Sequence, residues 1–171
     1  MTTQHPFGSL SHMASVHIET SVISYLAARP SPALIAAAHQ QVTREWWDNH
    51  RSRFEQFISP LVLDEASRGD PDAVARRLSA LEGFAVLDPT QSAAELVDIL
   101  ITKGALPSAA RDDATHVAIA TVHQIDYLVT WNCRHIDNAE TKPIIRSVCA
   151  VHGYTCPEIC TPEELMGRQS V

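Results

Sequence analysis

The stretch from 15 to 21 reads Ser15-Val16-His17-Ile18-Glu19-Thr20-Ser21. It alternates β-branched apolar side chains with polar ones and then passes into hydroxyl-bearing residues. This pattern is typical of a β-strand that runs directly into a helix. The interpretation places a carboxylate, that of Glu19, at the C-terminal end of the strand.

The same change from a short apolar run to a helical pattern recurs along the chain. Further strands are predicted over 57–62, 84–87 and 127–131, with a short end strand near Tyr154. Helices are predicted over 22–28, 33–54, 63–68, 71–81, 92–104, 108–123 and 144–152. Alternating strands and helices predict an α/β fold of three layers, α/β/α, around a mostly parallel sheet of four to five strands.

Length and composition favour one domain. The chain has 171 residues, of which 45% are hydrophobic, and its formal charge is -7 from 20 acidic and 13 basic side chains. This balance argues against a protein that coats nucleic acid with a basic face, although acidic residues gathered in one cleft can bind cations. We expect one domain over 15–167, between short tails at 1–14 and 168–171.

No apolar stretch is long enough to span a membrane, and the first residues lack the pattern of a secretory signal. We therefore expect a cytoplasmic protein that does not contact a membrane. The four cysteines are expected to be reduced thiols. The spacing Cys149, His152, Cys156 and Cys160 also allows a zinc site, but buried thiols and a surface histidine are the favoured interpretation.

Acidic and amide side chains follow the predicted strands. Glu19 follows the first strand, the pair Asp64 and Glu65 follows the second, and Asn132 follows the strand over 127–131. In parallel sheets these ends meet at one edge, where ligands bind. Carboxylates brought together repel one another unless divalent cations lie between them, and oxygen ligands without a histidine pair suit Mg²⁺ or Mn²⁺. Such a site suggests phosphodiester hydrolysis.

Four segments resemble, in order, the four motifs of the PIN-domain family: Val16-His17-Ile18-Glu19-Thr20-Ser21, Ser59-Pro60-Leu61-Val62-Leu63-Asp64-Glu65, Asp112-Asp113-Ala114-Thr115-His116-Val117-Ala118 and Leu128-Val129-Thr130-Trp131-Asn132. The resemblance covers about residues 15 to 167. The subgroup whose first motif reads Glu-Thr-Ser, which is VapC-like and toxin-like, looks closest. The resemblance implies a PIN-like α/β/α fold and a Mg²⁺- or Mn²⁺-dependent endoribonuclease.

Carried over motif by motif, the resemblance assigns the catalytic site to four residues. Glu19, Glu65 and Asp113 are the implied metal ligands. The fourth motif normally offers an acid, whereas this chain has Asn132, which can coordinate a cation through its carbonyl oxygen or hydrogen-bond a metal-bound water. The loss of one charge should weaken a second ion, and Asp112 or Asp137 could compensate for it.

Other residues near the motifs are candidate auxiliaries. The hydroxyls of Thr20, Ser21 and Thr130 would steady a phosphate or a ligand. Arg111 and Arg134 are candidate RNA contacts, because a guanidinium matches the geometry of a phosphate. We interpret His116, like His123 and His135, as an ordinary satisfied side chain.

The resemblance also implies partners. The substrate would be RNA, a cognate antitoxin protein would cover the cleft, and the chain would pair as a homodimer. Two alternatives remain open. A PIN-like module weakened in catalysis could serve binding or regulation, and a DNA-processing nuclease could use the same pocket, because metal chemistry does not distinguish ribose from deoxyribose.

Overall fold

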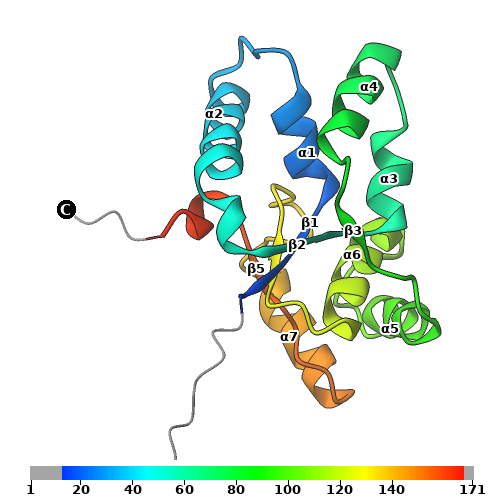
Figure 1. Cartoon of the computed structure of the whole chain (residues 1–171). Helices are drawn as coiled ribbons and strands as arrows, with labels where there is room; N and C mark the ends of the chain where they lie inside the picture. The colour runs from blue at the N-terminus through cyan, green and yellow to red at the C-terminus, as the bar shows by residue number, and fades with distance from the viewer. Residues whose placement is uncertain (1–12, 168–171) are drawn as a thin grey trace, which may run out of the picture.

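A five-stranded sheet forms the centre of the molecule (Figure 1). The computed structural model describes residues 13–167, so residues 1–12 of the tail predicted at 1–14, and the tail predicted at 168–171, lie outside the described residues. The strands are β1 (Ser15–Ile18), β2 (Glu55–Ile58), β3 (Ala85–Val86), β4 (Tyr127–Val129) and β5 (Glu158–Cys160). They lie in the order β3-β2-β1-β4-β5, and every neighbouring pair is parallel. The predicted α/β fold is confirmed.

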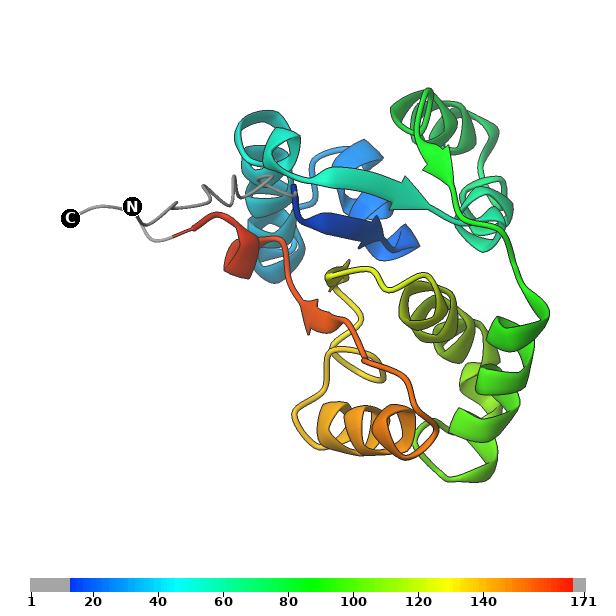
Figure 2. The same cartoon turned by 60° about the horizontal axis from the view of Figure 1, so that its bottom comes forward.

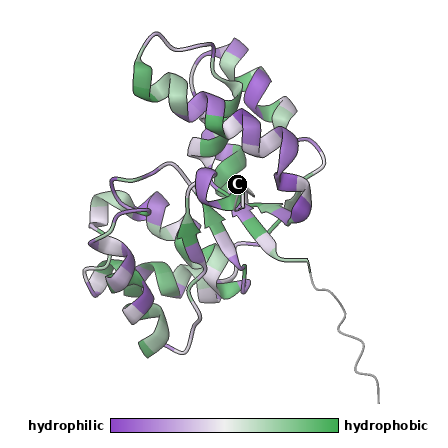
Figure 3. Ribbon diagram, turned by 90° about the vertical axis from the view of Figure 1, so that its left-hand side faces the viewer, coloured by the Kyte–Doolittle hydropathy of each residue, from purple (hydrophilic) through white to green (hydrophobic). Residues whose placement is uncertain are grey.

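Helices cover both faces of this sheet. They are α1 (Thr20–Ala27), α2 (Leu34–Asn49), α3 (Pro60–Ala66), α4 (Pro71–Ala80), α5 (Gln91–Thr102), α6 (Arg111–Val122) and α7 (Thr141–Val151). Figure 2 shows α1 to α4 on one side of the strands and α5 to α7 on the other. The helix ribbons carry both hydrophilic and hydrophobic residues (Figure 3), as amphipathic helices do.

The two faces of the strands fill two separate cores, because successive side chains of a strand point to opposite sides. Val16 and Ile18 pack with α1, α2 and α3 around the buried Trp46. Leu128 and Ile159 pack with α5, α6 and α7. This division gives the three layers that the sequence predicts.

Some element boundaries differ from the prediction. The second strand ends at Ile58, and α3 begins at Pro60 behind the capping side chain of Ser59. Proline at the first helical position favours this start, because its missing N–H has no partner there anyway. Glu65 therefore lies in the last turn of α3, whereas the helix predicted over 63–68 would have placed it in the first turn.

Two further boundaries differ. The helix predicted over 33–54 ends at Asn49 and is followed by a short 3₁₀ turn at Arg51–Arg53. The last strand lies at Glu158–Cys160 and not near Tyr154. None of the helices within residues 13–167 combines the length and the apolarity that a membrane span requires.

Candidate metal site

Glu19 lies where β1 ends and α1 begins, at the carboxyl edge of the sheet. Its backbone N–H donates to the carbonyl of Val129 on the neighbouring strand at 3.1 Å. Glu19 occupies the N-cap position of α1, yet its side chain makes no capping hydrogen bond. Instead, Oε2 accepts from Thr130 Oγ1 at 2.7 Å and from Ser21 Oγ. Glu19 is only 6% exposed, so its carboxylate is not a solvated strand end. It is not a helix cap either, because it makes no capping hydrogen bond.

Glu65 reaches the same place from α3. Its Oε2 atom accepts from Thr20 Oγ1 and from His116 Nε2, the latter at 3.0 Å. The side chain is 21% exposed, so one side of the site is open to solvent.

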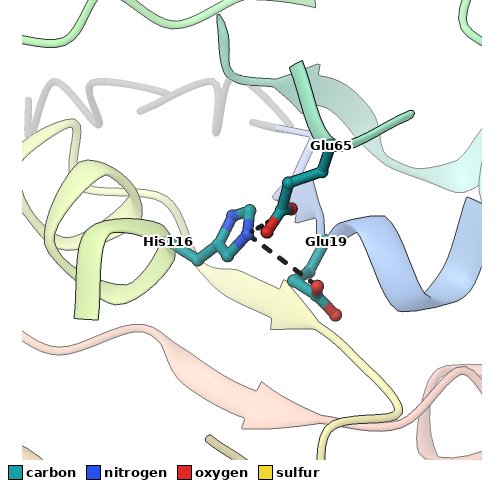
Figure 4. Close-up of side chains that lie close together, drawn as sticks. All are labelled: Glu19, Glu65 and His116. Carbon is teal, nitrogen blue, oxygen red and sulfur yellow. Dashed lines mark hydrogen bonds and ion pairs between the residues drawn. The ribbon is translucent and has the colours of Figure 1, made fainter. Parts of the chain in front are cut away.

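His116 completes the site from α6. Its side chain is 1% exposed, and Nε2 lies 3.0 Å from Glu65 Oε2 and 3.8 Å from Glu19 Oε1. One ligand atom from each of the three residues lies within 4.8 Å of the other two. Figure 4 shows these side chains converging from three separate elements. This group, which we call the Glu-Glu-His site, could hold a metal ion.

The positive charge of a protonated His116 offsets part of the negative charge of the two carboxylates. Burial by itself would raise the pKa of the Glu65 carboxyl, but the hydrogen bond and charge of His116 and the Thr20 hydroxyl together hold it below its usual value. Burial would likewise lower the pKa of His116, but the bond to Glu65 and the charge of Glu19 raise it. The imidazolium thus supplies the positive charge that a cation would supply in its place.

Asp113 lies beside this group and is not one of its three members. Its Oδ1 accepts from Asn132 Nδ2 at 2.9 Å. The pKa of the half-buried Asp113 carboxyl is raised, mainly by burial and also by the charge of Glu19, against the hydrogen bond from Asn132. A carboxylate that is costly to ionise is suited to accept a proton.

Asn132 orients Asp113. Its Oδ1 accepts from the backbone N–H of His135 at 3.1 Å, which turns its amide nitrogen toward Asp113. Its own backbone N–H donates to Thr130 Oγ1 at 2.9 Å. The carbonyl oxygen that was expected to coordinate a cation is therefore already engaged by the backbone.

The expected site residues fall into two groups. Those that the fold brings together are Glu19, Glu65, Asp113, Asn132, Thr20, Ser21 and Thr130. The other four make no hydrogen bond or ion pair with the Glu-Glu-His site within residues 13–167. Asp112 and Arg134 are exposed. Asp137 pairs with Lys142 at 2.5 Å, and Arg111 donates to Asp98 at 2.8 Å.

The sequence interpretation missed His116, which it treated as an ordinary satisfied side chain. One signal was available, because His116 follows Asp113 by three positions and residues spaced in this way share a face of a helix. Spacing alone could not show that this face turns toward Glu19 and Glu65, since those residues come from other elements.

A second buried histidine lies behind His116. The ring of His17 on β1 is 5.9 Å from that of His116, between ring centroids. Neither ring nitrogen of His17 has a hydrogen-bond partner among the described residues. Burial, with the charge of His116, lowers the pKa of His17 to about 3, so this imidazole is neutral.

The alternative zinc pattern does not form a site. Cys149 and Cys160 are buried, Cys156 is partly buried, and His152 lies on the surface with Nδ1 bonded to the carbonyl of Val148. Within residues 13–167 the Glu-Glu-His site is the group of possible ligands that comes together. The favoured interpretation of thiols and a surface histidine agrees with this arrangement.

Comparison with known proteins adds no family: no family model matches the chain, and no curated protein matches it. The PIN-domain resemblance therefore remains a prediction that rests on the four motifs.

Proposed function

We propose that the protein is a metal-dependent endoribonuclease that hydrolyses phosphodiester bonds of RNA. The observation that carries the proposal is the Glu-Glu-His site at the carboxyl edge of the sheet, with Asp113 beside it. The buried carboxylate of Glu19 and the partly exposed one of Glu65 together carry one negative charge more than the His116 imidazolium can offset. A divalent cation that took the place of the His116 proton would offset both carboxylates and could also activate a water molecule for hydrolysis.

The donor atoms of the site fit such an ion. Glu19 and Glu65 offer oxygens, which Mg²⁺ and Mn²⁺ prefer, and His116 offers Nε2 once its proton has left. An imidazole ligand favours a softer ion than Mg²⁺. We therefore propose Mn²⁺ as the preferred ion and Mg²⁺ as the second choice, where the sequence alone had ranked the two equally.

When bound, the ion would polarise a phosphate oxygen and make a water molecule more acidic. The remaining work falls to side chains of this chain. Ser21 and Thr130 hold the Glu19 carboxylate in place, and Thr20 holds that of Glu65. Asp113, fixed through Oδ1 by Asn132, is free to take the proton of the attacking water at Oδ2.

The choice of RNA and of a toxin role rests on the resemblance to VapC-like PIN domains. On that basis we propose a cognate antitoxin as partner and a homodimer as the assembled form. The exposed side chains of Leu34 and Ile35, at 85% and 73%, are apolar surface that a protein partner could cover.

A cleavage assay tests the proposal directly. Labelled RNAs and single-stranded DNAs are incubated with Mn²⁺, Mg²⁺ or EDTA, using the wild type, Asp113→Asn and Asp112→Asn. We expect cleavage of RNA that requires metal, falls by at least about a hundredfold in Asp113→Asn and persists in Asp112→Asn. Asp112 is the matched control, because it is the exposed neighbour and undergoes the same chemical change.

Two results would contradict the proposal. Cleavage of DNA in preference to RNA would support the DNA-processing nuclease. No cleavage of any substrate by folded, partner-free protein would support the binding module instead.

A further inference from the structure

A hollow of about 330 Å³ lies between the C-terminal end of α1 and the helix α4. Three arginines line it: Arg29, which follows α1, and Arg76 and Arg77, which belong to α4. In a chain with a formal charge of -7, three guanidinium groups around one hollow are a local reversal of sign.

The two arginines of α4 are held in place by backbone carbonyls. Arg76 Nε donates to the carbonyl of Ala27 at 2.8 Å, and Arg77 Nε donates to that of Ala66 at 3.0 Å. Ala27 and Ala66 are the last residues of α1 and α3, whose final carbonyls have no partner within the helix. These bonds fix the guanidinium planes before any ligand arrives.

The hollow carries excess positive charge. No carboxylate among the described residues lies within ion-pair distance of Arg76 or Arg77, and Arg29 has only the exposed Asp72 at 3.6 Å. The one acid that lines the hollow, Asp70, caps α4 by accepting from the backbone N–H of Ala73 at 3.0 Å. Both Nη groups of Arg76 make no hydrogen bond within residues 13–167 and can serve an anion.

The hollow is connected to the Glu-Glu-His site along α1. A neighbouring pocket of about 610 Å³ is lined by Ser21, whose hydroxyl donates to Glu19, and it shares Ser24 and Arg29 with the arginine hollow. The eight residues of α1 span roughly 10 Å between the two ends. A strand lying in the site could therefore follow α1 to the hollow.

We propose that the arginine hollow binds a backbone phosphate of the RNA strand, a few nucleotides from the scissile bond. The guanidinium fork matches a phosphate in geometry and charge. The inference rests on the proposed function, because it takes the strand that passes the Glu-Glu-His site as its ligand. An acidic segment of a protein partner is the rival occupant.

Binding without cleavage tests the inference. A fluorescent single-stranded RNA is titrated in EDTA with the wild type, Arg29→Gln, Arg76→Gln and Arg44→Gln, and each titration is repeated over a range of salt concentrations. Arg29→Gln is the main variant because the Arg29 side chain, unlike those of Arg76 and Arg77, donates to no backbone carbonyl within residues 13–167. Arg44→Gln is the matched control, since Arg44 is an exposed arginine of α2 that lines neither pocket.

We expect Arg29→Gln to weaken binding roughly fivefold, as the loss of an exposed ion pair allows. The salt dependence, as the slope of log K against log[salt], should become shallower by about 0.7 for one lost phosphate contact. Arg76→Gln should act in the same direction, with its folding checked by thermal melting. Arg44→Gln should change the affinity and the slope little.

The inference would be overturned if Arg29→Gln and Arg76→Gln both bound RNA with the affinity and the salt dependence of the wild type. A polyglutamate peptide that binds in an Arg29-dependent way, while RNA binding does not depend on Arg29, would overturn it in favour of a protein partner. The two proposals fail separately. Metal-dependent cleavage with arginine-independent binding contradicts only the hollow, whereas arginine-dependent binding without cleavage contradicts only the nuclease.

Discussion

Two buried imidazoles, 5.9 Å apart between ring centroids, lie in regions of opposite character. His116 faces two carboxylates at the carboxyl edge of the sheet, and its pKa is raised. His17 lies on β1, two residues before Glu19. No carboxylate within residues 13–167 pairs with it, and burial lowers its pKa to about 3. Both are fully shielded, so burial does not separate them. The comparison teaches that Glu19 and Glu65, and not burial, make the edge a place for a cation.

Removing one carboxylate at the sheet edge should leave His116 in surroundings more like those of His17, and the site should then bind a cation less well. Glu65→Gln leaves His116 without its hydrogen-bonded acid, so we expect Mn²⁺ affinity to fall by at least about a hundredfold, measured by isothermal titration calorimetry. Asp64→Asn is the matched control, because Asp64 is the exposed neighbour that pairs with Arg68. Equal Mn²⁺ affinity in the two variants would remove Glu65 from the site.

The second prediction concerns pH. Mn²⁺ can bind His116 only after its proton leaves, and the pKa of His116 is raised, so affinity should increase by about tenfold per pH unit as pH rises toward that pKa. It should level off above it. Calorimetry in a series of buffers from acid to mildly alkaline pH would measure this, and an affinity independent of pH would exclude His116 as a ligand.

The same titration affects the protein without metal. Because the folded pKa of His116 is raised, its contribution to stability is present below the unfolded value of 6.5 and is lost as pH rises through the folded pKa. Added Mn²⁺ should restore stability above that pH.

The last prediction concerns the interior. His17 is neutral in the folded protein but gains a proton below pH 6.5 when unfolded, so its contribution to stability is lost as pH falls from about 6.5 to about 3. The slope is about 1.4 kcal/mol per pH unit. His17→Leu should unfold with a shallower acid dependence in urea titrations, whereas the surface control His152→Gln should keep the wild-type slope.

Much of the fold followed from periodicity. Apolar alternation located the strands, and helical spacing located the helices between them, so the parallel α/β sheet was predictable. The boundary of α3 was not, because Ile58 and Val62 are both apolar and only the cap at Ser59 separates strand from helix. That boundary decides which turn of α3 carries Glu65.

The residues of the candidate site also include some that the sequence predicted and some that it did not. Glu19 was predictable, because residues that follow parallel strands meet at one edge. Glu65 was preferred over Asp64 only by its place in the second motif. The roles of His116 and Asn132 were not predictable. His116 is set by the packing of α6 against the sheet, and Asn132 turns toward Asp113 because its Oδ1 is taken by the backbone N–H of His135.

By itself, the sequence determined the order of elements, the parallel sheet and the placement of acids at its edge, because these follow from local periodicity and from connections along the chain. Only the tertiary structure decided that an imidazole from α6 completes the site and that arginines of α4 surround the far end of α1. Both depend on contacts between residues about 50 positions apart, from Glu65 to His116 and from Ala27 to Arg76. No local sequence pattern encodes contacts between residues so far apart in the chain, because these contacts arise from the packing of whole helices.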